Sequence, residues 1–137
     1  MKIIFLDVDG VLNSANDLYS IELKNDKHFD LLKELVDKSG AKIVLSSSWR
    51  IGFSPATHKS DNVLDTKLKD RGISIYDFTP CMTGERSDEI HEWLKENPVD
   101  KFVILDDEEV SYPNLVQTDT MVGLQKEDIE KALKILA

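Results

Sequence analysis

The sequence is poor in cysteine and in basic residues, and it has no long apolar run. Cys81 is the only cysteine among the 137 residues, so no internal disulfide can form, and we expect a cytoplasmic protein with Cys81 as a buried or spectator thiol. No apolar run approaches the roughly 20 residues of a membrane-spanning helix, so we expect no membrane partner. Asp7 also interrupts the first apolar run too early for a secretory signal.

The charge balance narrows the class of partner. The chain has 17 Lys and Arg against 26 Asp and Glu, a net charge of −9. This charge argues against a broad basic surface for nucleic acid, although contact with a nucleic-acid end stays open. The 41% hydrophobic and 31% charged residues are typical of globular proteins. The length predicts one domain over residues 1–137, large enough to bury roughly two-thirds of its unfolded surface.

The most informative segment lies near the N-terminus. Residues 3–6 form an apolar run that is too short for a helix and is rich in β-branched and aromatic side chains, so we expect a strand of a parallel sheet buried on both faces. Asp7, Asp9 and Gly10 follow at its carboxyl end, where open α/β sheets bind ligands. Two carboxylates held close together favour a hard divalent cation with oxygen ligands. An acidic turn that uses the glycine is the alternative interpretation.

Two further apolar runs also end in polar residues. Residues 43–45 are followed by Ser46 and Ser47, whose hydroxyls and backbone N–H groups suit a phosphate. A serine-rich turn that caps the next helix is the alternative there. Residues 102–105 are followed by Asp106 and Asp107, which repeat the acidic ending of the first strand. A loop that is only negatively charged is the weaker interpretation, because two separate apolar strands each end in aspartates.

The other elements alternate between helix and strand. Apolar spacing and turn residues predict helices over about 26–39, 61–71 and 126–136, and a further helix that opens within residues 84–94. They also predict strands over 73–78 and 114–118 and loops over 51–60 and 79–83. We expect Ser87 to cap the third helix, with Arg86 just before its start. Such alternation predicts a three-layer, Rossmann-like α/β fold with a parallel sheet and helices on both faces.

The motifs together resemble those of the haloacid dehalogenase (HAD) superfamily. The apolar strand ending Asp-x-Asp-Gly-Val resembles the first motif, and Ser46, Arg86 and the pair Asp106–Asp107 fit the second, third and fourth motifs in order. The segments 5–13 and 46–50 look most like the capless HAD domain of Swiss Army Knife RNA repair proteins. The third motif usually has Lys, so Arg86 departs from the pattern and changes the geometry of its contacts.

The resemblance implies a fold and a chemistry. It implies a five-stranded sheet in the order 5-4-1-2-3 and Mg²⁺-dependent hydrolysis of phosphate monoesters. It further implies that Asp7 is the nucleophile that forms an aspartyl-phosphate and that Asp9 is the general acid and base. Ser46, with Ser47 beside it, and Arg86 would hold the phosphate oxygens. The metal ligands would be Asp7, the backbone carbonyl of Asp9, Asp106 and, directly or through water, Asp107.

The lengths of the connecting segments bear on the substrate. Residues 13–26 are too few for a folded cap, and most of residues 51–86 belong to core elements, so we expect a minimal cap or none. An open site suits a phosphate on a large molecule, such as a nucleic-acid end, or closure by another subunit. The expected partner is a phosphorylated substrate, either a small molecule or a nucleic-acid end, and the oligomeric state stays open. We expect Trp49 to pack beneath the loop and Arg50 to touch substrate. The alternatives are a phospho-acceptor signalling module and a non-catalytic HAD-fold binding domain.

Overall fold

A parallel sheet forms the centre of the computed structural model, which describes residues 1–15, 23, 26–52, 63–81 and 84–137. Its strands pair in the order β3-β2-β1-β4-β5, and all pairs are parallel. Counted from the other edge this is the expected order 5-4-1-2-3, so the predicted topology is confirmed. The strands are β1 (Lys2–Leu6), β2 (Lys42–Leu45), β3 (Ile75–Phe78), β4 (Lys101–Asp106) and β5 (Leu115–Gln117).

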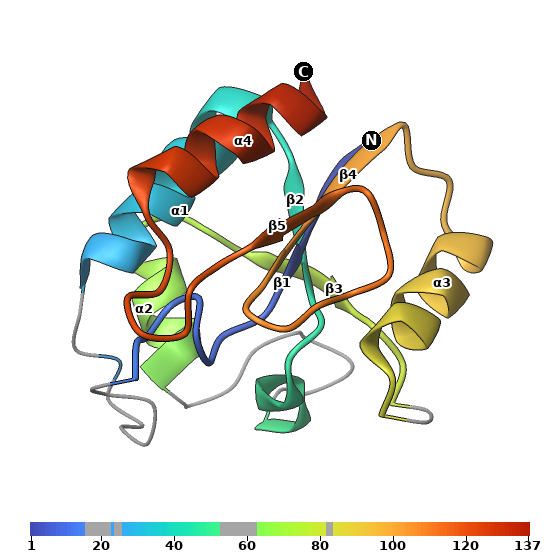
Figure 1. Cartoon of the computed structure of the whole chain (residues 1–137), viewed down its shortest axis with the longest axis horizontal. Helices are drawn as coiled ribbons and strands as arrows, with labels where there is room; N and C mark the ends of the chain where they lie inside the picture. Colours follow the sequence, from blue (N-terminus) through green and yellow to red (C-terminus); the bar gives the residue numbers. More distant parts are fainter. Residues whose placement is uncertain (16–22, 24–25, 53–62, 82–83) are drawn as a thin grey trace.

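Helices cover both faces of the sheet and complete three layers (Figure 1). One face carries α1, α2 and α4, whose buried side chains share one core cluster, and the other face carries α3. No described element forms a cap. The helices are α1 (Asp26–Ser39), the 3-10 helix η1 (Ser48–Gly52), α2 (Val63–Lys69), α3 (Arg86–Glu96) and α4 (Lys126–Leu136).

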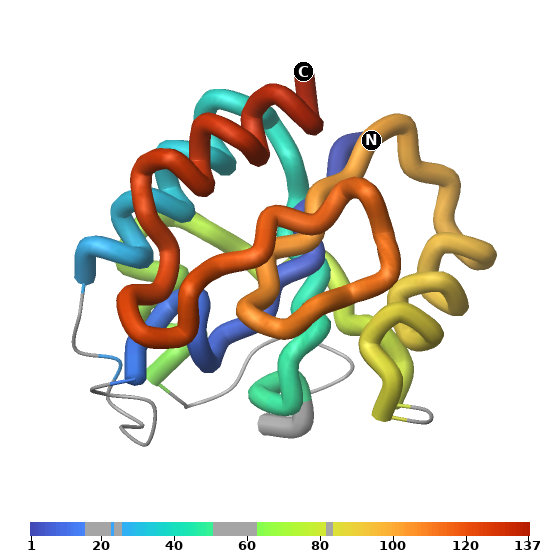
Figure 2. Tube along the Cα trace, viewed as in Figure 1, coloured from blue at the N-terminus to red at the C-terminus, as the bar shows by residue number. Residues whose placement is uncertain are grey.

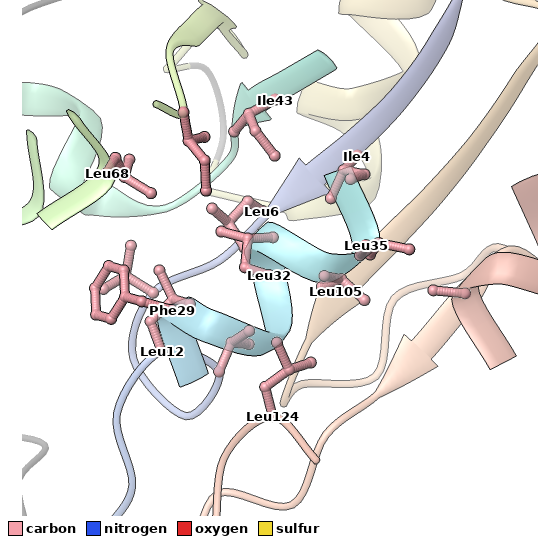
Figure 3. Packing of buried hydrophobic residues seen from close by; sticks show 14 of the residues in the cluster. Ile4, Leu6, Leu12, Phe29, Leu32, Leu35, Ile43, Leu68, Leu105 and Leu124 are labelled. Carbon is pink, nitrogen blue, oxygen red and sulfur yellow. The ribbon is translucent and has the colours of Figure 1, made fainter. Parts of the chain in front are cut away.

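Alternation along β1 explains why both faces are apolar. Ile4 and Leu6 pack into the cluster beneath α1, among its leucines (Figure 3), whereas Phe5 packs against α3. There the rings of Phe5 and Trp93 meet edge to face, with centroids 5.5 Å apart. A central strand buried on both faces is therefore the pattern that an unbroken apolar run predicts.

The carboxyl ends of the strands lie away from the two chain termini. Figure 2 shows both termini together near the end at which β1 begins, whereas η1 lies at the opposite end of the molecule. The polar residues that follow β1, β2 and β4 are therefore collected at one edge of the sheet.

Several element boundaries differ from the prediction. The first helix matches its predicted range, but β3 begins at Ile75 instead of 73, and β5 is confined to Leu115–Gln117. The second helix ends at Lys69, and its predicted first residues, 61–62, lie outside the described residues. The predicted loops 51–60 and 79–83 fall partly outside them as well, and residues 51–52 belong to η1.

The start of α3 corrects the predicted helix cap. Glu85 is the N-cap, and Arg86 is the first helical residue, so the expectation that Ser87 caps this helix is wrong. The backbone N–H of Glu89 donates to the Glu85 carbonyl at 3.1 Å, which closes the first turn two residues earlier than expected. Arg86 thereby points from the first turn of the helix toward the sheet edge.

Within the described part of the chain, no helix is both long and apolar enough to cross a membrane.

Candidate functional site

Strand register brings together three of the predicted site residues. Leu6 is paired with Leu45 on one side and with Leu105 on the other. Pairing continues one residue further, because the N–H of Asp7 donates to the Leu105 carbonyl and the N–H of Ser46 donates to the Leu6 carbonyl. Ser46, Asp7 and Asp106 therefore stand side by side, and we call them the strand-end row.

The strand-end row faces α3. Phe5, Val44 and Ile104 all belong to the core cluster beneath α3. The row lies two residues beyond them on the same three strands, and side chains two apart on a strand share a face. Its members are hardly accessible, since Asp7 is 5% exposed and Ser46 and Asp106 are fully buried.

Asp7, Asp106 and Asp107 form a carboxylate cluster. One oxygen from each of the three lies within 4.8 Å of the others. Burial raises the pKa of Asp7, the charge of Asp106 raises it further, and Arg86 lowers it. Burial also raises the pKa of Asp106 against the lowering effect of Arg86. A hard cation with oxygen ligands would relieve this repulsion, so the donor set fits Mg²⁺.

Arg86 brings a positive charge to the carboxylate cluster. Its Nη1 lies 3.2 Å from Asp7 Oδ1 and also contacts Asp106 Oδ2. Burial lowers the pKa of Arg86, but the two carboxylates more than offset that effect and raise it above its ordinary value. Arg86 is thus a permanent cation that bridges the nucleophile candidate Asp7 and the metal-ligand candidate Asp106. It lies where the third HAD motif has its basic residue.

Asp9 lies outside the carboxylate cluster and is held by other residues. One of its carboxylate oxygens accepts from Asn13 Nδ2 at 2.9 Å, and the other accepts from Trp49 Nε1 at 3.3 Å. Asn13 is itself fixed, because Gly10 N–H donates to its Oδ1 at 2.8 Å. Trp49 was expected only to pack beneath the loop. In the structure its indole N–H also donates to the Asp9 carboxylate.

Gly10 allows the loop after β1 to approach Asp107. Its φ is +81°, and a Cβ placed there would lie 2.2 Å from Asp107 Oδ2. Threonines after β5 brace this contact, since Thr118 Oγ1 donates to the Gly10 carbonyl at 2.7 Å and Thr120 Oγ1 donates to Asp107 Oδ2 at 2.8 Å. Sequence reasoning missed both threonines, because Thr118 was assigned to the end of the predicted strand 114–118 and Thr120 lies two residues beyond it.

The hydroxyls at the end of β2 differ from each other. Ser46 Oγ is buried without a hydrogen-bond partner, whereas Ser47 Oγ accepts from the backbone N–H of Trp49 at 3.2 Å. Thr79, which follows β3 and pairs beside Ser46, is a second buried hydroxyl without a partner. Unpaired buried hydroxyls cost free energy, so Ser46 beside Asp7 is the better candidate of the two serines for a phosphate oxygen.

Arg50 is committed to structural contacts. Its guanidinium donates to the carbonyls of Ser46 and Ser47 at 2.8 and 3.0 Å, and it forms a buried ion pair with Glu89 at 3.1 Å. Arg50 Nε also donates to Cys81 Sγ at 3.0 Å, and Cys81 is exposed, not buried. These bonds tie η1 to α3, which differs from the substrate contact expected for Arg50.

Comparison with known proteins gives one family. A family model described as the HAD domain in Swiss Army Knife RNA repair proteins matches residues 3–129. The matched range includes the whole carboxylate cluster, Asp9, Ser46 and Arg86. No curated protein and no solved structure matches the chain.

The glycine at the site generates the first prediction. Both Gly10 and Gly40 have positive φ, at +81° and +70°, but a Cβ on Gly40 would meet nothing within 4 Å. Gly40→Ala should cost about 1–2 kcal/mol of unfolding free energy from backbone strain alone. Gly10→Ala should cost about 1–3 kcal/mol more, because the new methyl group displaces Asp107. Urea unfolding of the two variants measures the difference, and equal losses would contradict the close approach.

Proposed function

The chain belongs to the family of HAD domains in Swiss Army Knife RNA repair proteins, and from this premise we propose that it is a Mg²⁺-dependent phosphomonoester hydrolase working through an aspartyl-phosphate on Asp7. The observation that carries the proposal is the strand-end row beneath Arg86. It sets a carboxylate between an unpaired hydroxyl and a second carboxylate, with a cation touching both acids. A nucleophile, a phosphate ligand and a metal ligand are thereby adjacent.

The carboxylate cluster and the backbone carbonyl of Asp9 are the groups that would hold Mg²⁺. When bound, the ion would offset the charge of the phosphate and of the carboxylate that attacks it. The cluster supports this role because its three oxygens converge while burial raises the pKa of Asp7 and Asp106.

The side chains at the site have separate roles in the two chemical steps. A carboxylate oxygen of Asp7 attacks phosphorus, and the bond from phosphorus to the leaving oxygen breaks. Asp9 gives that oxygen a proton, and in the second step it takes a proton from the water that hydrolyses the aspartyl-phosphate. The Ser46 hydroxyl and the Arg86 guanidinium bind the non-bridging oxygens and stabilise their developing charge.

Substitution of the two aspartates tests these roles. Asp7→Asn removes the nucleophile, so no covalent intermediate should form. Asp9→Asn keeps the backbone carbonyl but loses the acid and base, so turnover should fall by about 10²- to 10⁴-fold. With an aryl phosphate the first step needs little protonation, so phosphate should accumulate on Asp7 in Asp9→Asn.

Intact-mass measurement after a rapid quench detects that intermediate. A mass gain in Asp7→Asn, or normal turnover by that variant, would show that Asp7 is not the nucleophile. A stable phosphorylated wild-type protein without turnover would point to a phospho-acceptor module. Binding of phosphate esters without either event would point to a binding domain.

Metal dependence is a separate prediction. Activity should require Mg²⁺ and be inhibited by Ca²⁺, which takes more ligands at longer distances and so spoils in-line attack. Asp107→Asn should raise the Mg²⁺ concentration needed for half-maximal rate. Asp37→Asn is the matched control, since it removes the same charge from an exposed position on α1 that pairs only with Lys33 among the bonds described. Full activity in excess chelator would contradict the metal mechanism.

The open end of the sheet bears on the class of substrate. The lack of a cap among the described elements favours a phosphate on a large molecule, such as the end of an RNA, over a small metabolite. The kcat/KM for a 3′- or 5′-phosphorylated oligonucleotide should exceed that for the matching mononucleotide. The net charge of −9 opposes a polyanion, so the advantage should grow as salt screens the repulsion. A preference for the mononucleotide at all salt concentrations would exclude a polymer end.

A further inference from the structure

The Asp9 carboxylate is held on both of its oxygens by uncharged N–H groups. Asn13 Nδ2 donates to one oxygen at 2.9 Å, and Trp49 Nε1 donates to the other at 3.3 Å. Asn13 lies in the loop after β1, whereas Trp49 lies in η1 after β2. The two donors therefore approach Asp9 from separate segments, and together they fix both the position and the rotation of the carboxylate.

Each donor is itself firmly supported. Asn13 is fully buried, and its amide orientation follows from Gly10, whose N–H can only donate to Oδ1 and so turns Nδ2 toward Asp9. Trp49 packs against the core cluster that contains α1 and α2, and its backbone N–H is bonded to Ser47 Oγ. The residue after it, Arg50, anchors η1 to α3 through the buried pair with Glu89.

We propose that Trp49 and Asn13 are positioning residues for proton transfer by Asp9, an inference that rests on the proposed phosphatase function. Proton transfer requires the donor within hydrogen-bond reach of the leaving oxygen, so an unrestrained Asp9 side chain would spend less time in the productive orientation. Hydrogen-bonded neighbours fix the orientation of a functional group, and at metal sites the loss of such a neighbour typically costs about 10- to 100-fold in affinity or activity. Uncharged donors fix the orientation without adding a charge beside the transferring phosphate.

A second tryptophan provides a control for the hydrogen bond between Trp49 and Asp9. The chain has two tryptophans, and the second, Trp93, donates its indole N–H to Asp77 Oδ2 at 2.8 Å. Trp93 lies in α3 and packs on Phe5, and neither of its partners belongs to the proposed chemistry. Trp49→Phe and Trp93→Phe therefore each remove one indole–carboxylate hydrogen bond, but only the first involves Asp9.

The kinetic test compares a good and a poor leaving group. Release of the alcohol in the first turnover should fall about 10-fold in Trp49→Phe with an alkyl phosphate, because the variant loses one orienting partner of Asp9 and the leaving oxygen needs a proton. It should fall much less with an aryl phosphate, and KM should change little for either. Trp93→Phe should leave the alkyl-to-aryl ratio at its wild-type value. Asn13→Asp, which keeps the acceptor for Gly10 N–H but turns a carboxylate toward Asp9, should lower the ratio further than Trp49→Phe.

A second readout needs neither substrate nor metal. Protein labelled with ¹⁵N in tryptophan should give two indole N–H signals, one for each tryptophan. Asp9→Ala should shift the Trp49 signal and speed its exchange with solvent while the Trp93 signal stays in place, and Asp77→Ala should do the reverse. Failure of Asp9→Ala to move the Trp49 signal would overturn the proposal.

The experiments distinguish the proposed phosphatase function from the positioning role of Trp49. A wild-type protein without phosphatase activity would overturn the proposed function. An active wild-type protein whose Trp49→Phe variant keeps the wild-type alkyl-to-aryl ratio would overturn the positioning role alone. An equal loss in Trp49→Phe and Trp93→Phe would have the same meaning, because it would trace the effect to packing.

Discussion

Two carboxylates on neighbouring strands are the constraint around which this edge of the sheet is built. Parallel pairing puts Asp7 beside Asp106, and the apolar faces that bury the strands also remove water from both acids. Burying like charges together is costly unless a positive charge joins them. Arg86 does so from the first turn of α3, and it contacts both acids through a single nitrogen, Nη1. The difference between Arg and the usual Lys is thus smaller at this contact than the shapes of the side chains suggest.

The surrounding loops can be understood as supports for this charge arrangement. Asp107 approaches closely because position 10 has no side chain, and Thr120 holds the oxygen that faces the glycine. On the other side, the buried pair of Arg50 and Glu89 ties η1 to the same helix that supplies Arg86. Movement of α3 would therefore disturb the charge balance at Asp7 and also the support of Trp49.

This arrangement separates the two aspartates of the first motif, although only one residue lies between them. Asp7 is buried in the strand-end row, where its partners are charged. Asp9 lies beyond the strand, where its partners among the described residues are the uncharged N–H groups of Asn13 and Trp49. Different surroundings suit the different work proposed for them, since a nucleophile needs its charge managed and a proton carrier needs its orientation maintained.

The sequence by itself determined the parallel sheet and the acidic strand ends, because these depend on local apolar runs and on the residues that follow them. The range of α1 was predictable for the same reason. The order of the strands followed from the family resemblance. Only the tertiary structure decided the partners. Trp49 meets Asp9 and Arg50 meets Glu89 across 40 and 39 residues, and Thr79 lies beside Ser46 through pairing of β2 with β3. The start of α3 at Arg86 also escaped prediction, since Ser87 was the better cap by residue type. Such partners depend on strand register and on how helices pack, and neither is encoded in the spacing of a single segment.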